Sequence, residues 1–212
     1  MTYALAALIL LMACVPLRPS LLHAPATPLE ATDYDAVIAS WTRSARVYRG
    51  LDNKLFVSST FHAAEFRRAF AVAFPDIYGS GGLITRRELV DLSDGIEQYH
   101  NFFVSVFTPD VRWNDLSKID SIWHLSLHSS NGNTTSTSEI VPVKLDENIR
   151  AVYRYPSRFD RGYLVRFPLV NHEGKQLIDT ATTWFSVRIA SALGVADLRW
   201  DVVDPPTPAA DG

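Results

Sequence analysis

The chain has very little cysteine, since Cys14 is the only one among its 212 residues. A single cysteine cannot form a disulfide within the chain or a dithiol redox pair. Long apolar runs are also missing. The run that starts at Ala4 ends at Pro16, after about 12 residues, whereas a membrane-spanning helix needs about 20. The sequence therefore predicts neither a disulfide-stabilised scaffold nor a transmembrane helix.

An excess of basic charge is missing as well. The chain has 20 lysines and arginines against 23 acidic residues, which gives a formal net charge of -3 at pH 7. Proteins that bind nucleic acid neutralise its phosphates with clustered basic residues, so we expect no nucleic-acid partner. Hydrophobic residues make up 47% of the chain, which is enough for a substantial core at this length.

What the chain does have is a short uncharged segment directly before its cysteine. Residues 4–12 lead into Leu11, Met12, Ala13 and Cys14. An apolar stretch followed by a leucine, a small residue and a cysteine resembles the lipobox of bacterial lipoproteins. That resemblance implies cleavage before Cys14, acylation of its thiol and attachment to a membrane through the lipid. Two alternatives stay open, an ordinary signal peptide and a buried first helix with an incidental cysteine.

The resemblance also implies a location. Val15 rather than an aspartate follows the cysteine, which in lipoproteins favours the outer membrane over the inner one. We therefore expect a protein of the bacterial cell envelope, lipid-anchored and facing the periplasm or the exterior. The proline-containing segment after the cysteine has no sustained apolar period, which is typical of a tether. The chain then divides into a signal peptide (1–13), a lipid-proximal tether (14–31), one globular domain (32–204) and a flexible tail (205–212).

Between the terminal segments, the spacing of apolar residues predicts strands and a few helices. Residues 33–41 and 63–77 have apolar side chains at helical spacing, and a capping-box pattern at Thr85 predicts a further helix up to Ile96. Residues 129–138 are predicted to be a polar hairpin loop. Alternating or fully apolar segments predict strands at residues 43–48, 54–61, 102–107, 121–128, 139–143, 161–170, 183–190 and 196–203.

This order of elements predicts a mainly β fold of the α+β type. About eight strands at short spacing favour an antiparallel β-sandwich, which carries a two-helix insertion after the second strand. A mixed α+β layer fold is the alternative.

The familiar motifs of catalysis and metal binding do not occur. There is no G-x-S-x-G elbow, which positions the nucleophile in one large class of serine hydrolases. His124 and His128 lie in a predicted strand, where side chains four residues apart project about 13 Å from each other, too far to share a metal ion. The glycine cluster at residues 79–82 lacks the Lys-Ser/Thr pair of a phosphate-binding loop. We therefore predict no catalytic residue, no metal site and no cofactor.

The most distinctive polar segment interleaves arginines with aromatic residues between Arg150 and Arg166. Guanidinium groups and aromatic faces together suit anionic ligands or sugars, although long arginine side chains also commonly cover the edge of a sheet. Trp113 joins this set because it lies in a predicted loop, whereas Trp123 and Trp200 lie on apolar faces of predicted strands. The candidate surface for a ligand or partner consists of Trp113, Arg154, Tyr155, Arg158 and Arg161.

Together these features favour a non-catalytic binding or assembly module. Its expected partners are the membrane that holds its lipid anchor and an envelope protein or polysaccharide. The alternative is a hydrolase that acts on envelope material. A concave pocket with several polar side chains of perturbed pKa would favour the hydrolase, whereas a flat or shallow surface would favour binding.

Overall fold

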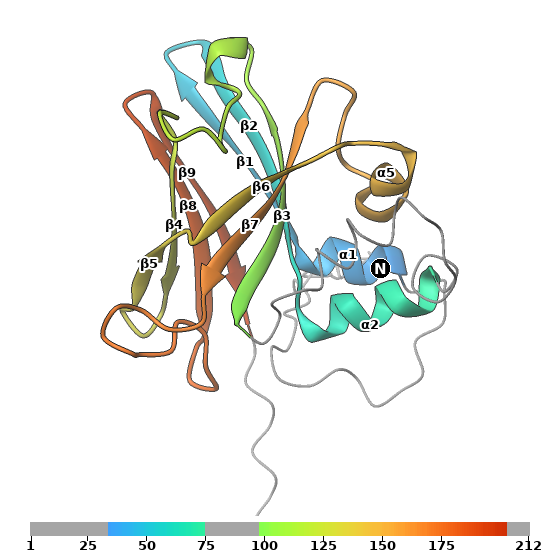
Figure 1. The fold of residues 1–212 in the computed structure, drawn as a ribbon, viewed down its shortest axis with the longest axis vertical. Coiled ribbons are helices and arrows are strands. Elements are labelled where there is room, and N and C mark those ends of the chain that lie inside the picture. Colours follow the sequence, from blue (N-terminus) through green and yellow to red (C-terminus); the bar gives the residue numbers. More distant parts are fainter. Residues whose placement is uncertain (1–33, 75–97, 203–212) are drawn as a thin grey trace, which may run out of the picture.

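The computed structural model of the chain describes residues 34–74 and 98–202. In these residues nine strands form two antiparallel sheets (Figure 1), which confirms the prediction of a mainly β fold. The first sheet, in the order β1-β2-β3-β7-β6, consists of β1 (Thr42–Arg49), β2 (Asp52–Phe61), β3 (Tyr99–Phe107), β7 (Arg161–Pro168) and β6 (Glu139–Val143). The second sheet, in the order β5-β4-β8-β9, consists of β5 (Thr134–Ser136), β4 (His124–Ser129), β8 (Trp184–Ser191) and β9 (Gly194–Asp201).

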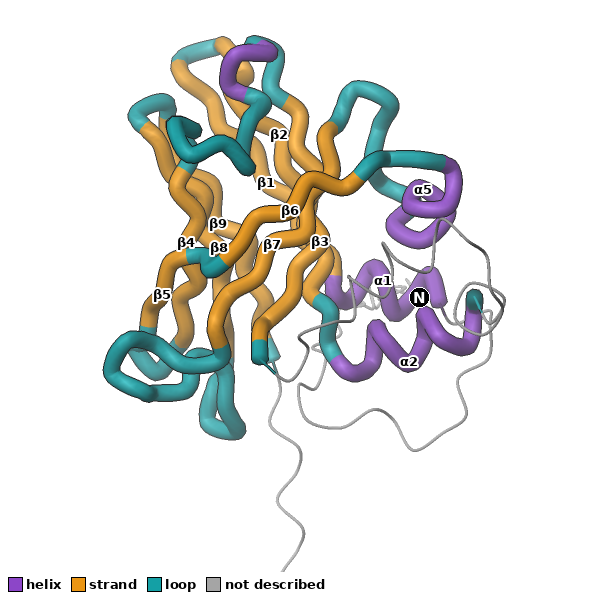
Figure 2. The backbone as a smooth tube through the Cα atoms, in the orientation of Figure 1, coloured by secondary structure: helices purple, strands orange, loops and turns teal. Residues whose placement is uncertain are grey.

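Three α-helices accompany the sheets in the described part of the chain, and a 3-10 turn, η2 (Val111–Trp113), follows β3. Figures 1 and 2 show the three helices on the outer side of the first sheet. No helix within residues 34–74 and 98–202 is long and apolar enough to cross a membrane. The helices are α1 (Tyr34–Trp41), α2 (Ala64–Ala73) and α5 (Glu147–Tyr153).

The two sheets pack on each other through aromatic rings. Phe102 of the first sheet lies 6.2 Å from Phe185 of the second, between ring centroids, and 5.5 Å from Trp200. Trp200 stacks on Phe185 at 5.2 Å, and its indole N–H donates to the carbonyl of Trp41 at 2.8 Å. All four side chains are buried. Removing these large rings from water stabilises the pair of sheets and attaches the end of α1 to them.

Helix α5 and Tyr155, two residues after it, pack on the outer face of the first sheet. Phe103 of β3 stacks on Tyr153 with 3.7 Å between ring centroids. Two residues later the Tyr155 hydroxyl lies 3.0 Å from the Thr60 hydroxyl, which in turn lies 2.7 Å from that of Thr42. A row of hydroxyls that bond to one another therefore continues the helix packing across β1 and β2 without leaving these polar groups unpaired.

All eight predicted strands occur in the structure with bounds shifted by at most a few residues, and a further strand and a further α-helix of the described residues were not predicted. The segment 129–138 is not only a loop, because it contains β5, which pairs with β4 through Ser126 and Ser136. Helix α5 was not predicted at all, although Asp146 caps it by accepting from the Ile149 N–H at 3.0 Å. The sequence contains the cap residue Asp146 and apolar residues at helical spacing, but the helix has only seven residues and overlaps the arginine-rich segment.

Several predictions concern residues outside the described ranges. Cys14, the signal peptide, the tether and the helix predicted between Thr85 and Ile96 all lie there. Within the described ranges, α2 follows β2 along the chain and precedes β3.

Four connections lie at one end of the two sheets, which we call the loop end. Figure 2 shows them together at the upper end of the strands. The β8–β9 turn reaches the β1–β2 hairpin there, since a Cβ added at Gly194 would lie 2.5 Å from Val47 Cγ1. That glycine also has a φ of +144°, so no larger residue fits the turn without strain. The loop end comprises residues 48–53, 108–123, 154–160 and 191–195.

Candidate functional site

The loop end presents most of the exposed large apolar side chains of the described residues. Leu51 in the β1–β2 turn and Ile119 in the 108–123 connection are fully exposed, at 103% and 105% of their reference areas. Single exposed apolar residues are normal, but their concentration at one end distinguishes the loop end from the rest of the described surface. Six of the eight such side chains belong to the loop end, namely Tyr48, Leu51, Val111, Ile119, Phe159 and Val195.

A strip of aromatic rings and guanidinium groups crosses the first sheet beside these tips. The Arg46 guanidinium lies 5.1 Å from the centre of the Phe56 ring, and Phe56 lies 5.9 Å from Phe107 on the neighbouring strand. Phe107 in turn lies 6.4 Å from Phe159, whose ring is covered by Arg158 at 4.8 Å. The pairing Arg46 to Phe56 to Phe107 follows strand register, so one face of β1, β2 and β3 carries the strip. We call these five residues the aromatic strip.

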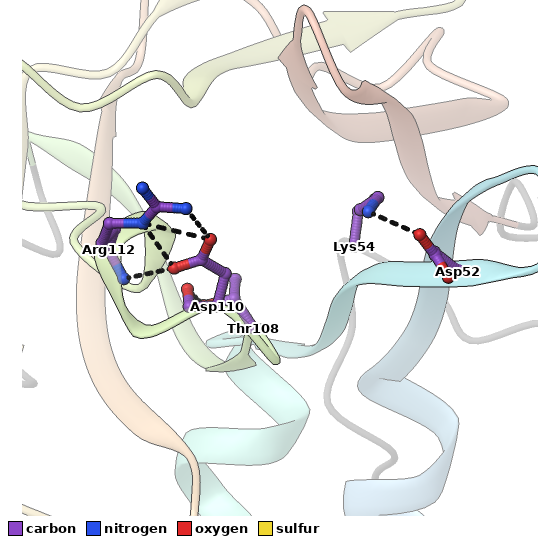
Figure 3. Close-up of polar contacts among 5 residues, drawn as sticks. All are labelled: Asp52, Lys54, Thr108, Asp110 and Arg112. Atoms are coloured by element: carbon purple, nitrogen blue, oxygen red, sulfur yellow. Dashed lines mark hydrogen bonds and ion pairs between the residues drawn. The ribbon is translucent and has the colours of Figure 1, made fainter.

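A carboxylate at the loop end is fully compensated by its neighbours (Figure 3). Asp110 accepts from the Arg112 guanidinium at 2.6 Å, and this hydrogen bond holds the pKa of the exposed Asp110 carboxyl at about 2. Asp110 also accepts from the Arg112 backbone N–H, which caps η2, while Thr108 donates to the Asp110 carbonyl at 2.8 Å. These contacts fix η2, at whose start Val111 is 75% exposed.

Positive charge at or beside the loop end is only partly compensated. Within the described residues, four exposed arginines form no ion pair, namely Arg46, Arg49, Arg158 and Arg161. The paired basic residues are Lys54, Arg112 and Lys118, which lie within 4.0 Å of Asp52, Asp110 and Asp115 respectively. The loop end and its immediate surroundings therefore present exposed apolar side chains together with guanidinium groups that form no ion pair. Such guanidinium groups can bind an anionic partner.

One serine and one histidine approach each other on the outer face of the second sheet. Ser126 Oγ lies 2.8 Å from His128 Nε2, and the other ring nitrogen lies 3.3 Å from the Thr134 hydroxyl. Burial and the Arg188 charge lower the pKa of His128. Asp197, the nearest acid, is instead engaged by Arg188 at 2.8 Å. A hydrolytic triad needs a carboxylate where Thr134 stands, so the pair lacks the group that orients the base.

A pocket of about 230 Å³ lies at the other end of the sheets, between the end of β2, the start of α2 and the start of β3. Among the described residues, His100 Nε2 and both polar side-chain atoms of Asn101 have no hydrogen-bond partner and are covered from solvent. Burial lowers the pKa of His100 to about 4, so this ring is neutral at pH 7. Because these polar atoms are covered, the pocket offers them to no ligand in this conformation.

Comparison with protein-family models, with curated proteins and with solved structures gives no significant match. The function is therefore inferred from the loop end and from the groups around it. No cluster of three or more metal-ligating side chains occurs within residues 34–74 and 98–202.

The structure separates the five residues predicted as a ligand surface. Arg158 belongs to the aromatic strip, and Trp113 lies half-buried at the loop end with the Arg112 guanidinium 5.5 Å from its ring. The Trp113 carbonyl accepts from the indole of Trp123, which is buried as predicted. Trp200 is buried as predicted too. Trp113 and Arg158 thus lie at the loop end with the aromatic ring of one and the charged group of the other still accessible.

Of the other three predicted residues, Arg154 and Tyr155 bond to other elements, and Arg161 is exposed at the start of β7. Arg154 pairs with Asp35 of α1 at 2.7 Å, so its charge is compensated on the helical side. The Tyr155 hydroxyl points to Thr60, and burial raises its pKa. Arg161 lies beside Tyr163, where it offsets part of the rise that burial causes in the pKa of that tyrosine.

The residues that sequence reasoning missed are the partners from β1, β2 and β3. Arg46, Phe56 and Phe107 are far apart along the chain, and only the strand register brings them together. Leu51 could have been found, because a large apolar residue between Gly50 and Asp52 is unusual in a tight turn.

Proposed function

We propose that the chain is a lipid-anchored protein of the bacterial envelope that acts as a non-catalytic binding module, with the loop end as its binding surface. The observation that carries this proposal is the concentration of exposed apolar side chains and unpaired arginines at one end of the sheets. The resemblance of residues 4–14 to a lipobox supports the anchor and an outer-membrane location facing the periplasm or the exterior. The partners are the membrane and an envelope protein or polysaccharide.

The scaffold that we propose for this module is an antiparallel β-sandwich with a helical insertion after the second strand. Support comes from the buried rings between the sheets and from the position of α2 between β2 and β3 along the chain. Such a scaffold holds four connections rigidly at one end, which is how loops commonly carry binding functions.

Replacing Cys14 with serine should remove the acyl anchor from the protein. The acyl chains that the lipobox implies are attached through the Cys14 sulfur, so serine removes their site. We expect the unaltered chain to sediment with membranes and to show an N-terminal mass consistent with an acylated cysteine, and Cys14→Ser to lack that mass. Val15→Ala is the matched control, since it changes a neighbouring residue and leaves the thiol. An unmodified thiol on an uncut chain in native membranes would refute the anchor.

The second candidate is an envelope-directed hydrolase, which the 2.8 Å contact between Ser126 and His128 favours. A fluorophosphonate probe reacts with serines that a neighbouring base activates. We expect no labelling of the native protein, because Thr134 rather than a carboxylate contacts the second nitrogen of His128. Ser44→Ala is the control for Ser126→Ala, since Ser44 contacts only the hydroxyl of Ser58. Labelling that disappears in Ser126→Ala alone would favour the hydrolase.

A further inference from the structure

We propose that the loop end docks on the anionic headgroups of a phospholipid bilayer, with its apolar tips in the interfacial layer. This inference rests on the proposed function, because it names the partner of the binding surface and assigns the protein a second membrane contact in addition to the lipid at Cys14. The contact would hold the sheets in one orientation relative to the bilayer.

The apolar tips have no role inside the fold. Leu51 and Ile119 are fully exposed, so neither side chain removes apolar area from water in the protein alone. They belong to separate connections, the β1–β2 turn and the segment before β4, and both lie at the same end of the strands (Figure 2). Tips that project from one end can enter a bilayer interface together, as the apolar faces of interfacial proteins do.

Among the described residues, the charged groups at or beside the loop end that form no ion pair are mostly guanidinium groups, with Asp120 beside Ile119 as an exposed carboxylate of opposite sign. Arg46, Arg49 and Arg158 form no ion pair within the described part of the chain. Guanidinium groups near such a surface bind phosphate oxygens while their long stems lie along apolar groups. In the aromatic strip the guanidinium groups of Arg46 and Arg158 lie over the rings of Phe56 and Phe159, so these charges lie beside apolar groups.

The aliphatic character of the tips argues against a polysaccharide as the main occupant. Sugar rings are bound on flat aromatic faces, whereas Leu51, Val111 and Ile119 offer branched aliphatic groups. Both rings that end the aromatic strip, Phe56 and Phe159, are already covered on one side by guanidinium groups. A bilayer interface accepts aliphatic and aromatic side chains alike.

The anchor does not prevent this orientation. Tyr34, the first described residue, lies 20 residues after Cys14. A chain of that length extends at most about 65 Å. The longest strand has 10 residues and spans about 34 Å. The loop end can therefore reach the bilayer that holds the lipid even if α1 lies on the far side of the sheets.

The test compares two double variants in the full chain that also carries Cys14→Ser, so that no acyl chain contributes. Binding to vesicles of equal parts phosphatidylglycerol and phosphatidylcholine is measured by flotation. We expect L51S/I119S to lower the partition coefficient about tenfold or more, because two fully exposed side chains lose apolar contact. The matched control is V72S/V170S, which changes two exposed valines away from the loop end and should leave binding unchanged.

A second pair of measurements tests the charge. Arg49→Gln/Arg158→Gln should weaken binding to the anionic vesicles, and the difference should vanish on vesicles of phosphatidylcholine alone. Equal flotation of L51S/I119S and V72S/V170S would overturn the proposal, as would loss of binding to an envelope protein or polysaccharide with flotation unchanged. The acyl mass at Cys14 is measured separately on the unaltered chain, so failure of the docking and failure of the anchor are distinguishable.

Discussion

Trp200→Ala should lower the free energy of unfolding by about 3–5 kcal/mol, which is the usual loss when a large buried aromatic side chain is truncated. Trp200 has no exposed area, stacks on Phe185 with an interplanar angle of 10° and contacts Phe102 of the other sheet. Truncation leaves a cavity between the sheets and leaves the Trp41 carbonyl without its indole donor. The measurement is chemical denaturation at pH 7 and 25 °C.

A tryptophan on the adjacent strand supplies the control. Trp184 of β8 is half-buried and covered by the Arg199 guanidinium at 4.5 Å, so Trp184→Ala should cost about 1 kcal/mol or less. Trp200→Phe keeps a single ring in the core and removes the indole donor with part of the ring volume, so its cost of about 1–3 kcal/mol should lie below that of Trp200→Ala. Similar losses for Trp200→Ala and Trp184→Ala would show that the rings between the sheets do not carry the stability assigned to them.

The strands could be predicted from the sequence because their burial is periodic. In β9 the buried residues Leu198 and Trp200 alternate with Asp197 and Arg199, and the structure places them on opposite faces as period two requires. The β1–β2 hairpin was predicted from the turn chemistry at Gly50, which has the positive φ that such turns need. The local pattern of apolar residues was sufficient to predict an element wherever one of its faces is buried and the other is exposed to solvent.

The short elements could not be predicted in the same way. Strand β5 has three residues, and none of them is buried, so no apolar pattern marks it. Its position depends on pairing with β4, which is a tertiary contact. In β3 the predicted strand began at Phe102, whereas the structure extends it back to Tyr99 through polar residues that pair with β7. Pairing with a neighbour overrides the weak strand preference of such segments.

The binding surface was only partly predictable for the same reason. Arg154 and Arg158 are four residues apart, and a helix across both would place them on one face. The structure ends α5 at Tyr153 and puts Arg154 in the left-handed region with a φ of 57°, so the chain turns there. Arg154 consequently pairs with α1, while Arg158 reaches the aromatic strip on the other side of the turn.

Exposed charged groups and buried ionisable tyrosines lie in different parts of the fold. The exposed charged groups of the loop end lie beside the apolar tips, where a bound partner would exclude water from both. The buried ionisable groups lie in the core and helical layer, where the pKa of Tyr153 and of Tyr155 is raised by burial and each hydroxyl already has a partner. The raised pKa values of these two tyrosines therefore accompany packing.

Acidification should destabilise the protein through His100. Its native pKa is about 4, lowered by burial from an ordinary value of 6.5. Above pH 6.5 neither state binds the proton, so the residue contributes no pH dependence. Between pH 6.5 and 4 the unfolded chain binds a proton that the native ring does not, so the free energy of unfolding falls as the pH falls. The total loss below pH 4 is about 3 kcal/mol.

His100→Phe isolates this contribution, because it keeps a ring beside Phe61 and removes the titrating nitrogen that has no partner. We expect the variant to be as stable as the unaltered protein or more stable at pH 7, and the difference in its favour to grow by about 3 kcal/mol between pH 7 and pH 4. His124→Gln, at an exposed position on β4, should leave the pH profile unchanged. Carboxylate titration affects all three proteins alike, so parallel profiles for His100→Phe and the unaltered protein would mean that the His100 ring takes up its proton as readily in the native state as in the unfolded chain.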